Sequence, residues 1–213
     1  MLIKEVIHAL ETLAPPSLQE AYDNSGLLIG SDMQVCHGAL ISLDCTEDVV
    51  EEAIRTNCNL IIAHHPIVFS GLKRITGSNY IQRVVIKAIQ NNIAIYAIHT
   101  NLDNVYDGVN AMICQKLKLQ HPQILSPMGG NLSKIVTYIP IDAYEKVSNA
   151  LFEAGVGNIG NYSHAGFASE GWGSFHGNES SNPTIGEKGK LEFVQEKKFE
   201  SVFPNYLQSA VVK

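Results

Sequence analysis

The chain has 213 residues, with 21 acidic and 15 basic side chains and a formal net charge of −6 at pH 7. Apolar residues make up 45% of it, which excludes intrinsic disorder and collagen-like repeats, and its length suffices for one large or two small domains. The acidic balance disfavours general nucleic-acid binding, and no apolar run approaches the ~18 residues that a membrane span needs.

The first residues, MLIKEVIHAL, lack a basic stretch followed by an apolar core, so we do not expect a signal peptide. The cysteines are scattered without a CxxC spacing, at Cys36, Cys45, Cys58 and Cys114. Such cysteines are typical of reduced thiols. We therefore expect a soluble cytoplasmic protein.

Helical and strand patterns alternate over residues 1–120. Helices are predicted at 3–13, which Pro15-Pro16 ends, and at 46–57, 79–91 and 107–118. Thr46 and Asp107 are the expected N-caps of the second and fourth of these helices. Short apolar strands are predicted at 39–43, 60–63 and 93–98. This alternation predicts a parallel sheet with right-handed crossovers.

The pattern changes at 121–133, where two prolines and a Gly pair indicate a linker. The elements expected after it are a strand at 134–139, a helix at 142–154 capped by Asp142, strands near 162–175 and 191–197, and a helix from Phe203. This order corresponds to a split-βαβ unit without its closing strand.

Polar residues follow each of the three predicted strands. Asp44 ends the first strand, His64 and His65 follow the second, and the sequence from His99 to Asp103 follows the third. In open parallel sheets, ligands bind at the carboxyl ends of the strands. Two neutral imidazoles and a carboxylate suit zinc or ferrous iron, and a bridging carboxylate can support a two-metal site that activates a shared hydroxide.

Other interpretations of these residues stay open. A His-His pair also occurs as a hydrogen-bonded loop feature, Asp103 can cap a helix, and Asp44 can serve only to orient a turn. His99 is a candidate for acid–base catalysis or for a hydrogen-bond partner of a metal ligand. A Walker-type G-x-x-x-x-G-K motif and a G-x-S-x-G elbow are absent from the sequence, which excludes the assignments that rest on these two motifs.

Two stretches, IIAHHPIVFSGLKRI at 61–75 and AIYAIHTNLDN at 94–104, resemble the signature of the dinuclear metal-centre toroid proteins. Many members of that family carry the name GTP cyclohydrolase 1 type 2 homolog. The earlier stretch YDNSGLLIG, at 22–30, is also similar to the family. The resemblance implies that His64, His65 and Asp103 bind two divalent ions, zinc or iron. His99 is our candidate for the catalytic residue because of its place after the third strand, not because of the resemblance.

The resemblance also implies an architecture. Residues 1–128 correspond to the first lobe of a parallel or mixed-sheet α/β domain, and 129–213 to an incomplete ferredoxin-like (PII-like) α+β insert that lacks its last strand. The family completes its metal site with a His-x-x-x-Glu motif from a second lobe and assembles into homohexameric toroids. That motif is absent here, so we expect the sequence to be the front part of a longer protein.

The function that the resemblance implies is divalent-metal binding, with metal-dependent hydrolysis of a nucleotide or related small molecule through a metal-bound hydroxide. The reaction would be of the cyclohydrolase or phosphoesterase type. Two alternatives stay open: a non-enzymatic metal-binding or regulatory protein, and an inactive truncated fragment.

Overall fold

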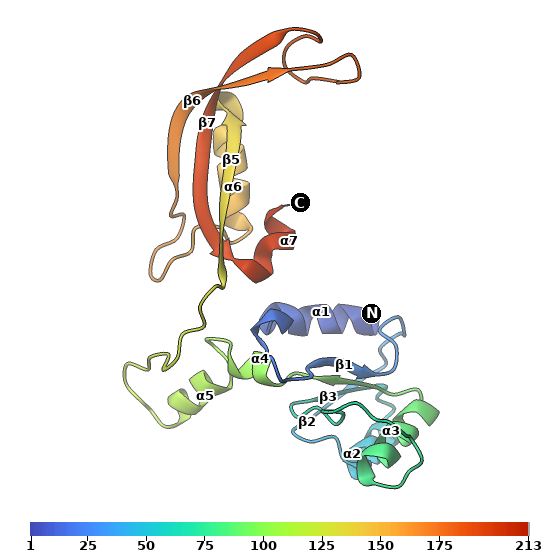
Figure 1. The fold of residues 1–213 in the computed structure, drawn as a ribbon. Helices are drawn as coiled ribbons and strands as arrows, with labels where there is room; N and C mark the ends of the chain where they lie inside the picture. Colours follow the sequence, from blue (N-terminus) through green and yellow to red (C-terminus); the bar gives the residue numbers. More distant parts are fainter. Residues whose placement is uncertain (213) are drawn as a thin grey trace. The chain divides into compact units, whose positions relative to one another are not determined.

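A computed structural model describes residues 1–212 of the chain. It divides into two compact units, residues 1–123 and residues from 124 onward (Figure 1). Each unit has its own sheet and its own apolar core, and the two are described separately below.

The first unit is built on a four-stranded mixed sheet with the order β1-β4-β3-β2. Its strands are β1 (Gly26–Ile29), β2 (Ala39–Ser42), β3 (Leu60–Ala63) and β4 (Ala94–Ala97). Strands β2, β3 and β4 are parallel, whereas β1 runs antiparallel to β4. The helices are α1 (Ile3–Leu13), η1 (Pro16–Leu18), α2 (Glu47–Arg55), α3 (Tyr80–Gln90), α4 (Thr100–Asp103) and α5 (Val109–Lys116).

Helices cover both faces of this sheet, with α1 on one face and α2 and α3 on the other (Figure 1). Every residue of β3 and β4 is buried, as expected for central parallel strands between two helical layers. The sheet therefore holds the carboxyl ends of β3 and β4 in a fixed register, with Ala63 opposite Ala97.

Thr46 caps α2 as predicted, because its hydroxyl accepts a hydrogen bond from the Val49 amide at 3.3 Å. The prediction that Asp107 caps the next helix is wrong, since Gly108 takes the N-cap position of α5. A Cβ atom at Gly108 would lie 2.0 Å from the Leu102 carbonyl oxygen, so this close approach of two backbone segments requires glycine. Strand β1 was not predicted, because its four residues lie inside a glycine- and polar-rich stretch.

The second unit contains a three-stranded antiparallel sheet with the order β5-β7-β6. Its elements are β5 (Leu132–Pro140), η2 (Ile141–Ala143), α6 (Tyr144–Glu153), β6 (Phe167–His176), β7 (Leu191–Pro204), η3 (Asn205–Leu207) and α7 (Gln208–Val211). Residues of β5, β7 and both helices form one core, which includes Ile139, Leu151, Phe199, Phe203 and Val211.

Two predictions for this unit are wrong. Asp142 does not cap α6, because it lies inside the turn η2 and Ala143 precedes the helix. No helix begins at Phe203, since β7 continues to Pro204. Phe199, Ser201 and Phe203 are all buried, and this period of two is that of a strand with one covered face.

The fold class predicted from the sequence is confirmed: a mixed α/β unit with parallel strands is followed by a unit with a separate antiparallel sheet. Among residues 1–212, none of the helices combines the length and the apolar composition that crossing a membrane requires.

Candidate metal centre

Three histidines come together at the carboxyl edge of the first sheet. His64 and His65 directly follow β3, and His99 lies two residues beyond the end of β4. One potential ligand atom from each histidine lies within 4.8 Å of the others. The ring centroids are 5.0 to 5.6 Å apart. The parallel pairing of β3 with β4 produces this convergence, because it brings both strands to the same edge side by side.

Each of the three imidazoles uses its Nδ1 atom in a hydrogen bond. The acceptors are the carbonyl oxygen of Ile98 at 2.9 Å from His64, Asp44 Oδ1 at 2.8 Å from His65, and Asp23 Oδ1 at 2.8 Å from His99. A carbonyl oxygen only accepts hydrogen bonds, and so does an ionised carboxylate. The network therefore assigns the proton of each neutral ring to Nδ1 and leaves the Nε2 lone pair free.

This arrangement fits a metal ion. Histidines that ligate metals commonly donate their second ring N–H to a carboxylate or a backbone carbonyl, which fixes both the tautomer and the ring orientation. Here all three histidines of the cluster meet that condition. The donor set of imidazole nitrogens is one that zinc and ferrous iron accept.

Asp103, the carboxylate predicted from the sequence, lies at the edge of the histidine cluster. Its Oδ1 atom is 3.8 Å from His64 Nε2, and it is the last residue of the short helix α4. The structure thus brings His64 and His65 together with His99 and places Asp103 beside His64. Asp103 does not cap the next helix; its backbone carbonyl accepts a hydrogen bond from the side chain of Asn110.

Asp44 and Asp23 approach the histidines from outside the cluster. Asp44 is largely exposed, and its role was left open by the sequence. The side chain of Asp23 is inaccessible to solvent. Asp23 was missed as a site residue, because it lies 76 positions before His99 and only the resemblance of its surrounding stretch singled it out.

The charge of Asp23 is stabilised by its neighbours. Burial by itself raises the pKa of this carboxyl group, but hydrogen bonds from His99, Thr100, Ser25 and the Asn24 amide outweigh it. The pKa of Asp23 is therefore held well below its ordinary value. The residue is an anion at neutral pH and can only accept hydrogen bonds.

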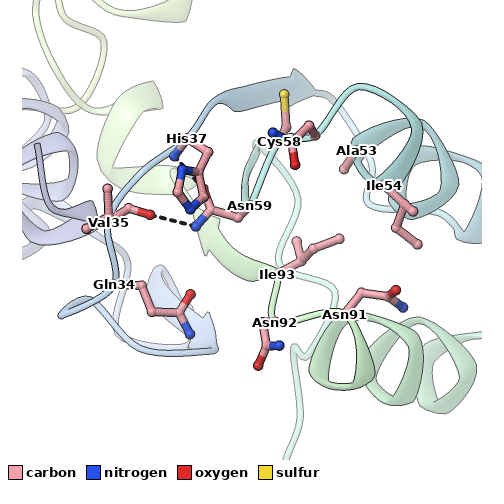
Figure 2. A pocket seen from close by; sticks show the side chains of 11 residues that line it. Gln34, Val35, His37, Ala53, Ile54, Cys58, Asn59, Asn91, Asn92 and Ile93 are labelled. Carbon is pink, nitrogen blue, oxygen red and sulfur yellow. Dashed lines mark hydrogen bonds between the residues drawn. The ribbon is translucent and has the colours of Figure 1, made fainter.

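A second concave region lies at the amino ends of β2, β3 and β4, at the opposite ends of these strands from His64, His65 and His99. This open pocket of about 490 Å³ is lined mainly by amide and apolar side chains (Figure 2). The side chain of Asn59 bridges two backbone groups there: it donates to the Val35 carbonyl and accepts from the His37 amide. Asn57 and Asn92 have positive φ and follow the ends of α2 and α3. These polar groups therefore serve turns and helix ends.

Comparison with known proteins gives a consistent result. A profile of the family described as Duf34/NIF3 (NGG1p interacting factor 3) matches residues 1–190. A Bacillus subtilis protein named GTP cyclohydrolase 1 type 2 homolog is 39% identical over 210 residues, covering 98% of this chain and 56% of that protein. A protein of the same name from Halalkalibacterium halodurans is 40% identical over 208 residues, covering 97% and 56%.

Solved structures agree with the sequence matches. The crystal structure of a Bacillus cereus protein related to NIF3 superposes with a TM-score of 0.87 at 40% identity, covering 100% of this chain and 56% of that one. The structure of the Staphylococcus aureus protein SA1388 gives a TM-score of 0.67 at 33% identity, covering 100% and 54%. This chain thus spans a little over half the length of the relatives that it matches.

Proposed function

Because the chain belongs to the Duf34/NIF3 family, we propose that the carboxyl ends of β3 and β4 form a divalent-metal site held by His64, His65 and His99. Asp103 lies next to His64, with its Oδ1 atom 3.8 Å from His64 Nε2. One observation carries this proposal: three histidines converge, and each has its Nδ1 atom engaged so that Nε2 is free. Three histidines with only a structural role would not need potential ligand atoms within 4.8 Å of one another.

The donor set favours zinc or ferrous iron over magnesium or calcium, since the hard ions prefer oxygen ligands. A divalent ion bound here supplies Lewis-acid chemistry, polarising an electrophile and lowering the pKa of water. The three histidines would hold the ion, and a hydrogen bond at Nδ1 orients each of them. The acceptor is a backbone carbonyl for His64 and a carboxylate for His65 and His99.

We further propose that the whole protein is a metal-dependent hydrolase of a nucleotide or related small molecule. Support comes from the name GTP cyclohydrolase 1 type 2 homolog carried by relatives at about 40% identity. Because the chain spans 56% of those proteins, the activity is proposed for the whole protein, and metal binding for the unit that carries the histidines. The second unit, with its β-α-β-β-α order, is proposed as a PII-like insert, and the assembly as a homo-oligomer.

Metal content provides the direct test of the first proposal. The purified chain is incubated with Zn²⁺, Mn²⁺ or, under anaerobic conditions, Fe²⁺, and unbound ions are removed. Elemental analysis by inductively coupled plasma mass spectrometry should then find retained zinc or iron. His64→Ala and His65→Ala should lose that metal. The exposed His8 on α1 offers a matched control, and His8→Ala should retain it. Equal metal content in wild type and the His64→Ala/His65→Ala double variant would contradict the proposal.

Hydrolysis is tested separately. Metal-loaded protein is assayed against GTP, other nucleotides and simple phosphoesters, with His64→Ala as the negative control and His8→Ala as the positive one. Turnover that requires both the metal and His64 supports a hydrolase. Metal binding without turnover on the whole panel would instead favour a metal-binding or regulatory protein.

A further inference from the structure

The segment Asp23–Ser25, just before β1, contacts both of the loops that carry the site histidines. It belongs to the stretch YDNSGLLIG, of which only the carboxylate of Asp23, as the hydrogen-bond acceptor of His99, has entered the site so far. The side chain of Asp23 is fully inaccessible, although this carboxylate lies next to a half-open cluster of imidazoles. A buried charge with no function is costly, so its contacts are informative.

Both carboxylate oxygens of Asp23 accept hydrogen bonds, some from the loop after β4 and some from the next two residues of the chain. Oδ1 accepts from His99 Nδ1 at 2.8 Å and from the Asn24 amide at 2.6 Å. Oδ2 accepts from the Ser25 hydroxyl at 2.9 Å, from the Thr100 amide at 3.0 Å and from the Thr100 hydroxyl. Because Thr100 directly follows His99, the carboxylate holds both the ring of His99 and the backbone that carries it.

The neighbouring residue reaches the loop after β3. Asn24 Nδ2 donates to the Val68 carbonyl oxygen at 2.5 Å, three residues beyond His65. The Ser25 amide in turn donates to Gln19 Oε1 at 3.2 Å, which connects the segment to the turn after η1. The consecutive residues Asp23 and Asn24 thus join the two histidine-bearing loops to each other, and Ser25 connects them to Gln19.

We propose that Asp23 is the positioning residue of the metal site: it fixes His99 in the Nδ1–H tautomer, with Nε2 directed at the cluster, while Asn24 holds the loop that carries His65. This inference rests on the proposed metal site and assigns one of its determinants to a segment outside the histidine loops. Asp23 acts through His99, so its effect is on the tautomer and orientation of that ring.

The substitution Asp23→Asn separates positioning from a general structural role. The single carbonyl oxygen of an Asn side chain is expected to stay on the Oδ2 side, which accepts from the Thr100 amide and from two hydroxyl groups, whereas the Oδ1 side accepts only from the Asn24 amide besides His99. Its NH₂ group then faces His99 Nδ1, which must become an acceptor. In the catalytic triad of serine proteases, an Asp→Asn change beside the histidine selects the wrong tautomer while leaving the geometry intact.

The first readout is the tautomer of His99 in metal-free protein, from two-bond ¹⁵N–¹H correlation spectra at pH 8 with ¹⁵N-labelled histidine. A His99→Gln variant assigns the signal. We expect Nδ1–H in wild type, Nε2–H in Asp23→Asn, and Nδ1–H in the matched control Asp48→Asn, whose side chain is exposed on α2. His99 in the Nε2–H form in wild type overturns the inference even if Asp23→Asn does not fold.

The second readout is zinc affinity by competition with a chromophoric chelator. Outer partners of metal-ligating histidines typically contribute about 10–100-fold in affinity, so Asp23→Asn should weaken binding by about that factor, and Asp48→Asn should not. Unchanged affinity together with an unchanged tautomer in folded Asp23→Asn overturns the inference. If wild type binds no zinc, the proposed function fails, whereas the tautomer still decides the role of Asp23.

Discussion

His65 and His99 are both oriented by a carboxylate, but the two hydrogen bonds lie in different surroundings. The Asp44 side chain is 61% exposed and that of His65 is 48% exposed, whereas Asp23 beside His99 is completely covered. Water screens the first pair, and exposed pairs contribute little. Water can also replace Asp44 as the acceptor of the His65 Nδ1–H group. The two carboxylates should therefore differ in importance.

We predict that Asp44→Asn weakens zinc binding less than tenfold, and much less than Asp23→Asn does. The measurement is the same chelator competition, carried out at two ionic strengths. The effect of Asp44→Asn should shrink at high salt because solvent and ions reach that pair. A loss in Asp44→Asn as large as that in Asp23→Asn would show that exposure does not decide the contribution of these carboxylates.

Cys45, next to Asp44, is predicted to be chemically inert in the folded protein. It is buried, and burial raises the pKa of its thiol from 9.0 to about 12. Only the thiolate reacts, so iodoacetamide at pH 7.5 should label the half-exposed Cys36, Cys58 and Cys114 first. Cys45 should react only after unfolding, as measured by peptide mass spectrometry. Labelling of Cys45 as fast as Cys58 would contradict this.

The raised pKa of the Cys45 thiol also affects the stability of the protein at high pH. A thiol whose pKa is higher in the folded state than in the unfolded state keeps its proton longer in the folded state. Its contribution to stability is therefore complete below about pH 9 and is lost as the pH rises toward 12.

At the scale of elements, Gln82 on α3 organises the loop that follows the histidines. Its buried Oε1 atom accepts hydrogen bonds from the backbone amides of Thr76 and Ser78, each at 3.0 Å, and from both of their hydroxyl groups. One side chain thus fixes the end of the loop against the helix that covers the sheet.

We predict that Gln82→Ala destabilises the protein by about 1 kcal/mol, because water can reach Thr76 and Ser78 and partly replaces the lost acceptor. Hydrogen exchange should rise locally at the amides of Thr76 and Ser78. Gln90→Ala, at the exposed end of the same helix, is the matched control and should change neither quantity. Unchanged exchange at both amides in Gln82→Ala would contradict the role of this side chain.

Elements with strong local signals could be predicted from the sequence, and elements decided by tertiary contacts could not. The apolar runs at 60–63 and 93–98 predicted β3 and β4 almost to the residue. The short strand β1 is defined by its antiparallel pairing with β4, and its four residues are too few for a local sequence pattern to predict a strand. The strand predicted at 191–197 is shorter than β7, because the sequence around Phe203 is equally compatible with a helix. Its pairing with Ser133 places Phe203 in the strand.

The candidate site divides in the same way. His64, His65 and Asp103 were predicted as ligands because they follow apolar strands and match the family signature. The convergence of His99 with the two histidines depends on the register between β3 and β4. Asp23 could not be assigned, since its hydrogen bond to His99 crosses 76 positions of sequence. A sequence pattern identifies groups at strand ends, whereas it does not identify a buried partner that comes from elsewhere in the chain.

At the scale of the whole molecule, the edge strand β2 leaves apolar side chains uncovered. Ile41 is 79% exposed and Leu43, just after the strand, is 62% exposed, while β2 pairs only with β3 among the described strands. An apolar sheet edge of this kind favours association. We therefore predict self-association, with a mass by light scattering above the 23.3 kDa of one chain.

The double variant Ile41→Thr/Leu43→Thr removes this apolar surface, and threonine at position 41 keeps a β-branched residue on the strand. Its mass should shift toward that of a single chain. Ile124→Thr, which changes an exposed apolar residue outside any element, serves as the control and should not shift it. A wild-type chain that is monomeric at micromolar concentration would contradict the prediction.

The division into two units predicts that the metal site does not need the second one. All the histidines and carboxylates of the site lie before residue 104, and the buried apolar clusters of the first unit draw on residues 3–105 only. The core of the second unit draws on residues 135–211. Between these cores, residues 115–130 are exposed throughout. Each unit therefore has its own source of stability, and a break between them removes no buried contact of either core.

We predict that a fragment of residues 1–123 folds and binds zinc as tightly as the whole chain, within a factor of about three. Helical circular dichroism and a cooperative thermal transition test folding, and chelator competition tests binding. Residues 124–213, prepared in the same way, should fold and bind no zinc, which controls for adventitious sites. A fragment 1–123 that folds cooperatively but binds zinc more than tenfold more weakly would show that the second unit contributes to the site. A fragment that does not fold would show instead that the two cores are not independent.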